Sequence, residues 1–490
     1  MKKHIFGFIK SILFLTILCF SLYFINMILR PKYTPQNSNW PSTTSYLQFY
    51  EMKENSVDVL FLGSSVTVNA FSPQEIYNNY GIRSYNLGSE QQSLFFSYYW
   101  LKEALRTQSP KVVVLDTRFL LSLHPSVPLN MKEPMVRKCM DPMKWSSVKC
   151  EAIADLCSID PEHSEMSYYL TNLRYHTRWT EADESDLDEA YYSSSQLKGF
   201  SALSTYGAES FKTYDPNPNR ISPPEIGDLM LKYLDKTVEL CKENGITLVL
   251  LSLPGNAMND GIHFALTDYA AEHGLDYYNF CETDQYAALG AELPRENTVD
   301  HSNLWGAIRL SNYMGNLLRE KYQVAPVSDP QYETTKDYYE RIKENAELSH
   351  ITDPLLYFQK IQENRYTLFL INVRNAYKQV TDDVQKTLET AGLQTDLRTQ
   401  PLYSYSAMMD PETGVLERFE EGYTNSLTGS LRDHSIYYKV SGSGTNSNGT
   451  VQIDKKTYTL NKSGINLLVY DTETGQVLDI AVINTNGLSR

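Results

Sequence analysis

Short, continuously apolar runs recur between residues 56 and 322, and they constrain the fold more than any other feature of the chain. Runs of this kind suit strands that are buried on both faces of a parallel sheet. Segments with helical spacing of apolar residues separate them, and this alternation predicts an α/β layered domain around a parallel sheet. The predicted strands are 57–62, 84–87, 111–116, 247–252 and 275–280.

The alternation breaks between residues 121 and 223, where polar and acidic residues surround the run Arg-Tyr-His-Thr-Arg-Trp at 174–179. We interpret this stretch as an insertion above the carboxyl edge of the sheet. Two roles remain open for it, which are substrate shaping and a purely structural cap. His176 and Trp179 are candidate substrate contacts under the first role and packing residues under the second.

Residues 1–30 predict a transmembrane anchor. The stretch 11–29 contains no charged residue, and with the apolar residues before it, at about 1.5 Å of rise per residue, it is long enough to cross a bilayer. A cleavable signal peptide is the alternative, but no small-x-small site follows Leu29. The lysines before the stretch slightly outnumber Arg30 and Lys32 after it. We therefore expect a cytoplasmic N-terminus and an extracytoplasmic main body.

Composition excludes several classes of function. A net charge of −15 over 490 residues argues against a nucleic-acid partner, which would require clustered basic residues. The five cysteines beyond the anchor show no CxxC spacing, so we expect no metal site, and no motif indicates a cofactor. Free thiols are the expected state, although one disulfide among Cys139, Cys150 and Cys157 stays open.

The character of the chain changes in its last third. A connector at 31–55 precedes the α/β domain of 56–322, and a linker at 323–349 follows it. Residues 350–490 predict a smaller α+β domain, in which a helix at 381–392 accompanies mostly short strands bounded by turn residues. The predicted strands are 365–373, 403–409, 415–419, 451–453, 457–460, 464–470 and 476–483.

Gly63-Ser64-Ser65 directly follows the first predicted strand, where a hydroxyl can sit at the carboxyl edge of the sheet. Acyl transfer at neutral pH requires an activated hydroxyl, a base and donors for an oxyanion. Ser65 is the candidate nucleophile and His301 the candidate base. The backbone amides of Ser65 and Gly88 are candidate oxyanion donors, because glycine lets the backbone approach an intermediate closely.

Three blocks carry a family resemblance. The sequences Phe-Leu-Gly-Ser-Ser at 61–65, Asn-Leu-Gly-Ser at 86–89 and His-Ser-Asn-Leu-Trp-Gly at 301–306 resemble the first, second and last blocks of SGNH/GDSL hydrolases. The greatest similarity is to the membrane-anchored, DltD-like bacterial branch. The resemblance implies a flavodoxin-like layered fold over about 56–322 and a serine esterase or acyltransferase.

Two departures from the family pattern leave the site incompletely defined. The family's acid stands three residues before the histidine, where this chain has Thr298, while Asp300 is directly adjacent to His301. Two arrangements stay open. Asp300 orients His301 in the first, and a backbone carbonyl holds the imidazole of a Ser-His dyad in the second. The third block's oxyanion asparagine is also missing, because the third strand ends in Leu-Asp-Thr-Arg at 115–118. Arg118, Gln91 and its neighbour Gln92 are candidate contacts at the site.

The C-terminal region resembles the interleukin-like EMT inducer (ILEI) domain over about 365–485. The matching segments are 366–370, 388–393, 451–454 and 464–471. These segments occur in the opposite order in the animal domains, so the resemblance implies a permuted variant. Because that family includes carbohydrate-binding modules, it also implies a glycan partner, whereas an accessory packing domain is the alternative.

Together these features predict an extracytoplasmic esterase or O-acyltransferase with a serine nucleophile, acting on acyl groups of a cell-envelope glycan or polymer. The alternative is a catalytically inactive scaffold of the same fold that serves in carbohydrate binding or envelope-polymer assembly.

Overall fold

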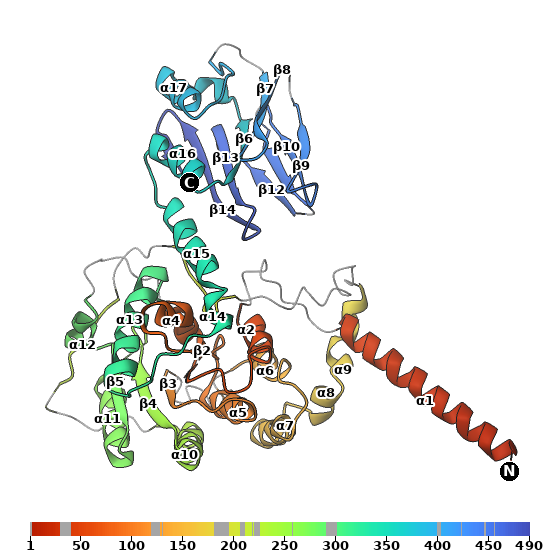
Figure 1. The fold of residues 1–490 in the computed structure, drawn as a ribbon, viewed down its shortest axis with the longest axis vertical. Coiled ribbons are helices and arrows are strands. Elements are labelled where there is room, and N and C mark those ends of the chain that lie inside the picture. Colours follow the sequence, from red (N-terminus) through yellow and green to blue (C-terminus); the bar gives the residue numbers. More distant parts are fainter. Residues whose placement is uncertain are drawn as a thin grey trace. The chain divides into compact units, whose positions relative to one another are not determined.

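The computed structural model divides the chain into two compact units, Met1–Tyr339 and Glu340–Arg490. Figure 1 shows the helices and strands of both units along the chain. The structure describes residues 2–29, 41–118, 128–129, 131–180, 196–205, 211–217, 219, 226–256, 258–290, 301–398, 403–422, 424–444, 447–454 and 456–490.

The first unit is built on a five-stranded parallel sheet with the strand order β2-β1-β3-β4-β5. The predicted parallel α/β domain is therefore confirmed, and each of the five predicted strands forms. This strand order is the flavodoxin-like one. The order in which successive strands are added to the sheet reverses between β1 and β3, while all strands stay parallel. The strands are β1 (Val59–Leu62), β2 (Ser84–Asn86), β3 (Val112–Asp116), β4 (Thr247–Ser252) and β5 (Asp276–Asn279).

Helices cover both faces of this sheet (Figure 1). Alternate residues of the strands point to opposite faces, so Leu60 and Leu62 join one core while Val59 and Phe61 join the other. The first core packs against α2, α5 and α10, and the second packs against α4 and α13. The helices are α2 (Pro41–Phe49), α3 (Ser65–Ala70), α4 (Pro73–Tyr80), α5 (Leu94–Ala104), α10 (Asp228–Glu243), α11 (Asp260–His273), α12 (Thr283–Ala288), α13 (Leu304–Glu320) and α14 (Pro330–Glu333).

Two segments between the predicted elements also form helices. Residues 41–49, within the connector, form α2, whose Tyr46 ring stacks on Trp100 with centroids 4.1 Å apart. The insertion supplies α6 (Glu133–Met140), α7 (Ser147–Ile159), α8 (Glu165–Tyr169), α9 (Asn172–Tyr175) and the 3-10 helix η1 (His176–Thr180). All six cysteines are free thiols.

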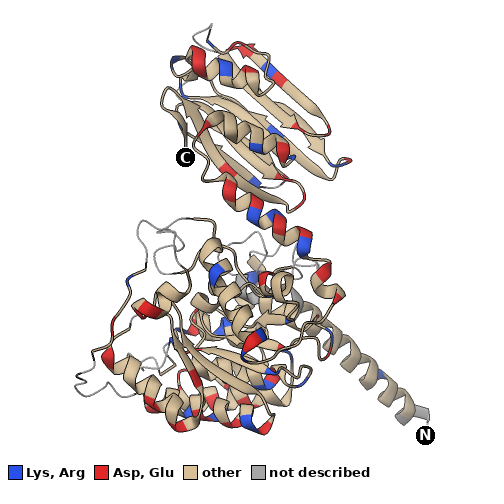
Figure 2. Cartoon of the chain, turned by 60° about the vertical axis from the view of Figure 1, so that its left-hand side comes forward, with Lys and Arg blue, Asp and Glu red and all other residues tan. Residues whose placement is uncertain are grey.

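The N-terminal helix α1 (Lys2–Leu29) has the length and composition of a membrane span over Ile5–Asn26. At about 1.5 Å per residue these 22 residues extend roughly 33 Å, close to the thickness of a bilayer's hydrocarbon core. Figure 2 shows α1 almost free of charged residues along its described length. A signal sequence passes the same test.

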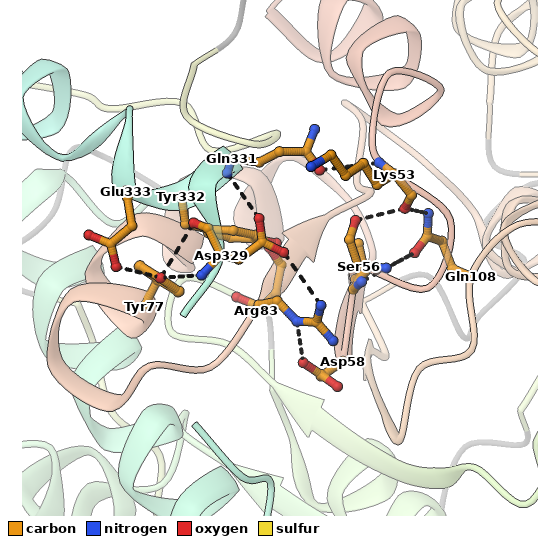
Figure 3. A network of polar contacts seen from close by, with 12 residues as sticks. Lys53, Ser56, Asp58, Tyr77, Arg83, Gln108, Asp329, Gln331, Tyr332 and Glu333 are labelled. Carbon is orange, nitrogen blue, oxygen red and sulfur yellow. Dashed lines mark hydrogen bonds and ion pairs between the residues drawn. The ribbon is translucent and has the colours of Figure 1, made fainter. Parts of the chain in front are cut away.

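A polar network closes the amino edge of the parallel sheet (Figure 3). Arg83, just before β2, donates from Nε to Asp58 Oδ2 over 2.8 Å and from Nη1 to Asp329 Oδ2 over 3.4 Å. Both carboxylates are buried. Tyr77 donates to Glu333 over 2.7 Å, which further ties α4 to α14. One guanidinium therefore joins the start of β1, the start of β2 and the approach to α14.

The second unit contains two antiparallel sheets. The larger one has the order β15-β14-β13-β6-β7-β8 and the smaller one the order β12-β11-β10-β9. The strands are β6 (Thr367–Val373), β7 (Tyr403–Asp410), β8 (Gly414–Glu421), β9 (Leu427–Leu431), β10 (Ile436–Ser441), β11 (Gly449–Ile453), β12 (Lys456–Leu460), β13 (Gly464–Asp471), β14 (Gln476–Asn484) and β15 (Gly487–Ser489). Of these, β9, β10 and β15 had not been predicted.

The inner strands β6 and β13 of the larger sheet are buried on both faces. Leu368 and Leu370 of β6 face the core shared with α16 (Pro354–Glu363) and α17 (Asp382–Thr390). Phe369 and Ile371 face the smaller sheet instead, where they pack with Val440 of β10. The predicted smaller α+β domain is confirmed.

Replacement of Arg83 by leucine should lower the free energy of unfolding of the first unit by about 1–3 kcal/mol, because Asp58 and Asp329 would lose a buried donor. Denaturant titration of the detergent-solubilised chain, followed by tryptophan emission, measures this, since all five tryptophans precede residue 340. The matched control is Lys102→Ala, whose salt bridge to Glu151 is solvent-accessible and should contribute about 0–1 kcal/mol. Equal effects of the two variants would contradict the prediction.

Candidate active site

The turn after β1 places two serines at the carboxyl edge of the sheet. Ser64 is the N-cap of α3, with an extended backbone, and Ser65 is the first residue of that helix. The amides of a first helical turn have no intrahelical acceptor, so the Ser65 N–H is available to a ligand. Ser64 is buried whereas Ser65 is partly exposed. Of the two hydroxyls, that of Ser65 is the one accessible to a substrate.

His301 reaches the same point from the far end of the unit's sequence. It stands two residues before Asn303, the N-cap of α13, whose Oδ1 accepts from the Gly306 N–H over 3.2 Å. His301 Nε2 lies 2.8 Å from Ser65 Oγ. A serine hydroxyl at this distance from an imidazole nitrogen can pass its proton to the ring as the oxygen attacks a carbonyl.

A buried carboxylate fixes the turn that carries Ser65. Asp116, the last residue of β3, accepts at Oδ2 from Ser64 Oγ over 3.1 Å and from Thr67 Oγ1 over 3.3 Å. Its Oδ1 accepts from Asn256 Nδ2 over 3.3 Å. Burial raises the pKa of Asp116 above its usual value, and the charge of Arg118 with the bonds from Ser64 and Asn256 offsets this only in part.

The turn also depends on close backbone packing. A Cβ at Gly63 would lie 2.3 Å from Thr67 Oγ1 and 2.5 Å from Asp116 Cβ, so no larger residue fits there. A Cβ at Gly88 would lie 2.9 Å from the Gly63 carbonyl oxygen, which accepts from the Ser89 N–H over 3.1 Å. Gly88 therefore lies directly against the turn that carries Ser65.

Residues 198–205, within the predicted insertion, connect the serine helix to the histidine loop. Ser201 N–H donates to the Val68 carbonyl of α3 over 3.1 Å, and Leu304 N–H donates to the Leu203 carbonyl over 2.8 Å. Asn69 Nδ2 donates to the Ser201 carbonyl over 2.7 Å. This segment thus spans from α3 to the start of α13 and holds the two sides of the site together.

Lys198 anchors that segment in the protein interior. Its ammonium donates to Thr335 Oγ1 over 2.6 Å and to Gln74 Oε1 over 3.2 Å, and it lies 4.5 Å from the centroid of the Tyr332 ring. Burial lowers the pKa of Lys198 to about 8. Sequence inspection missed this residue, because nothing near it in the chain distinguishes it from a surface lysine.

The remaining predicted site residues fall in several places. Asp300 and Thr298 lie outside the described residues. Arg118 follows β3, and its backbone N–H donates to Asp116 Oδ1 over 3.2 Å. Gln91 is exposed in the loop after Gly88. Its neighbour Gln92 is buried and donates to Ser97 Oγ over 3.1 Å, so it acts in packing.

His176 and Trp179 lie on η1 and are exposed. Among the described contacts neither residue touches Ser65 or His301. Asn256, by contrast, was not predicted, although it follows β4 and bonds to Asp116. A polar residue in the loop after a strand of a parallel sheet was the available signal. In the described part of the chain, no three His, Cys, Asp or Glu residues are grouped as metal ligands would be.

Comparison with known proteins gives fold-level likenesses only. No protein-family model and no curated protein matches the chain. A protein from Bacteroides fragilis named as an acylhydrolase shares 12% identity at a TM-score of 0.25, over 56% of this chain and 93% of its own. A GDSL-like lipase from Bacteroides thetaiotaomicron shares 10% identity at a TM-score of 0.28, over 57% of this chain and 99% of its own.

A gut microbial diltiazem-metabolizing enzyme shares 12% identity at a TM-score of 0.20, over 55% of this chain and 47% of its own. With TM-scores of 0.28 or lower, these likenesses assign neither a family nor an activity to this chain.

Asp116 should make stability depend on pH. Because its folded pKa is raised, the folded state holds a proton that the unfolded state releases, so stability falls as pH rises from the usual aspartate pKa to the raised one. Each pH unit between the two pKa values lowers the free energy of unfolding by about 1.4 kcal/mol. Asp116→Asn should remove this dependence on pH, even if the substitution also lowers stability by the same amount at every pH. Denaturant titrations of both proteins across that range measure it, and parallel stability curves would contradict the prediction.

Proposed function

We propose that this chain is a membrane-anchored serine esterase or O-acyltransferase of the SGNH/GDSL type. The observation that carries the proposal is the 2.8 Å contact between Ser65 Oγ and His301 Nε2 at the carboxyl edge of a flavodoxin-like sheet. Ligands of open α/β sheets bind outside the carboxyl ends of the strands, next to the point where the strand order reverses. Ser65 follows β1, which borders that point.

The reaction would proceed through a covalent acyl-enzyme. Ser65 Oγ attacks the acyl carbonyl while His301 Nε2 takes its proton, and the N–H groups of Ser65 and Gly88 donate to the oxyanion. Protonated His301 then gives the proton to the leaving alcohol as the carbon–oxygen bond breaks. Water or an acceptor hydroxyl next attacks the acyl-enzyme, His301 accepts its proton, and the proton returns to Ser65 Oγ as the product leaves.

The substrate proposed is an acylated polymer of a bacterial cell envelope. The support is a helix, α1, that has the dimensions of a membrane span, together with the sequence resemblance to the DltD-like branch. A cytoplasmic N-terminus would place both units outside the cell membrane. Arg118 and Gln91 would then contact substrate near Ser65, and Asp300 or a backbone carbonyl would orient His301.

For the second unit we propose carbohydrate binding by an ILEI-like domain. An open pocket of about 510 Å³ supports this, because its wall consists mainly of amide, hydroxyl and basic side chains. Groups of this kind provide the hydrogen bonds that fix a polar ligand in a pocket. They include Arg374, Gln379, Asn461, Lys462 and Asn484.

The nucleophile can be identified by covalent labelling. A fluorophosphonate probe should label the full-length chain in detergent, and Ser65→Ala should abolish the label. Ser64→Ala should keep it, because the buried Ser64 hydroxyl is directed to Asp116. His301→Gln should slow hydrolysis of a simple acyl ester by about 10²–10⁴-fold. Labelling that survives Ser65→Ala would assign the nucleophile to another residue, whereas absence of labelling in the unmodified chain would favour the catalytically inactive scaffold.

Glycan binding can be tested separately. Removal of one hydrogen-bonding side chain from the pocket should weaken binding by about 0.5–1.5 kcal/mol, or roughly two- to tenfold in Kd. Calorimetry of the full-length chain with purified envelope polysaccharide should therefore show this loss for Asn484→Ala. Gln359→Ala, on the exposed side of α16, is the control and should bind normally. Equal affinities of the two variants would exclude this pocket.

A further inference from the structure

Exposed apolar side chains are concentrated in one part of the first unit. Outside α1, all of its large hydrophobic residues that are exposed in the described structure lie between residues 145 and 179. Leu173 is 57% exposed and Trp179 is 71% exposed. They form the apolar patch, which consists of Trp145, Met166, Tyr169, Leu170, Leu173 and Trp179. Single exposed apolar residues are ordinary, but a concentration of this size on one surface indicates an interaction site.

Four residues of the patch lie close together in one segment of the chain. Met166 and Tyr169 belong to the short helix α8, Leu170 ends that helix in a non-helical conformation, and Leu173 belongs to the short helix α9. The Tyr169 ring continues the patch onto the bend before α7, where it stacks on Trp145 with centroids 5.8 Å apart. The apolar face is therefore continuous across two parts of the insertion.

The opposite side of the same segment is fixed to the protein. Tyr168 is fully buried, and the Arg137 guanidinium lies 3.6 Å from the centroid of its ring. Arg137 Nη1 donates to the Ser167 carbonyl over 2.9 Å, and Arg174 Nε donates to Glu133 Oε1 over 2.8 Å. A polar and aromatic attachment on the other side of the segment thus holds the exposed apolar side chains outward.

The patch begins where the candidate membrane span ends. Asn26 is the last residue of that span, and its Oδ1 accepts from Thr171 Oγ1 over 2.6 Å. Helix α1 also contacts α9 and η1. Thr171 lies between Leu170 and Leu173, so the middle of the apolar patch is at the level where the candidate span of α1 ends. In a bilayer, that level is the boundary between hydrocarbon and headgroups.

The composition of the patch fits this boundary. Tryptophan and tyrosine are enriched at membrane interfaces because their rings are apolar with one polar group. Apolar side chains of interfacial protein segments lie in the same zone, about 5–10 Å deep. Leucine and methionine supply the apolar contact in this segment.

We propose that the apolar patch inserts into the interfacial region of the phospholipid bilayer that α1 crosses. This rests on the membrane anchor of the proposed function. The patch is a second attachment beside the anchor, so it would fix the orientation of the first unit above the membrane. The ligand is the bilayer itself, through its headgroups and the adjoining part of its acyl chains.

Tryptophan quenching by brominated lipid tests the proposal directly, because bromine quenches only rings that approach the acyl chains. Helix α1 contains no tryptophan, so the anchor itself gives no signal. The full-length chain carrying Trp40→Phe is reconstituted into phosphatidylcholine–phosphatidylglycerol vesicles with acyl chains brominated near the carbonyl end, or with plain chains. We expect lower emission in the brominated vesicles. Adding Trp145→Phe and Trp179→Phe should abolish the difference, and adding Trp305→Phe should not.

The possible outcomes separate the patch from the anchor. Vesicle flotation after an alkaline wash first establishes whether the chain is integrally anchored. A chain that does not float overturns both the anchor and the patch. A chain that floats but shows equal emission in both vesicles overturns the patch alone and indicates that this surface binds another protein. Quenching that persists without Trp145 and Trp179 also overturns it. Because both rings are exposed, their replacement by phenylalanine should not disturb the fold.

Discussion

Burial of the parallel sheet on both faces is the constraint on which the first unit depends. The inner strands β1, β3 and β4 contribute alternate residues to two separate apolar cores, so their faces have no room for polar chemistry. Charged and hydroxyl groups are consequently confined to the two edges. At the amino edge, Arg83 joins Asp58 and Asp329 in a structural network. At the carboxyl edge, Ser65 meets His301. The same packing rule therefore separates the stabilising polar contacts from the candidate reactive ones.

Asp116 shows how a departure from a family pattern can acquire a role of its own. The sequence has aspartate at the end of the third strand, where the SGNH resemblance leads one to expect an asparagine nearby. In the structure this carboxyl accepts from Ser64 and Thr67, on both sides of Ser65 in the chain. It thus holds the turn in place, while the hydroxyl of Ser65 remains directed to His301. Its contribution is positional, which sequence spacing alone does not reveal.

The elements that were predictable are those with a strong local signal. Of the five parallel strands, β1, β3 and β4 consist mainly of apolar residues, and the Ser-Pro pair at the start of α4 is a local capping signal. Gly63, Ser65 and His301 were recognisable because short blocks carry them. The strand β9 was not predictable, because Gly429 and Ser430 are residues typical of turns. In the structure, the absence of a side chain at Gly429 makes room for Tyr438. Lys198 and Asn256 gain their roles only from residues distant in sequence. Such contacts require tertiary structure to be known.

The pairing of Ser65 with His301 joins residues 236 positions apart, and this separation has a kinetic consequence. Contacts between distant parts of a chain form late, because a long loop must be closed before they are made. A chain that leaves the ribosome N-terminus first exposes Ser65 long before His301 exists. Until β4, β5 and α13 have joined the sheet, the serine has no base and remains an ordinary alcohol. Reactivity of the Ser65 hydroxyl would thus arise only in a fully folded first unit, so incomplete chains would be chemically silent during synthesis.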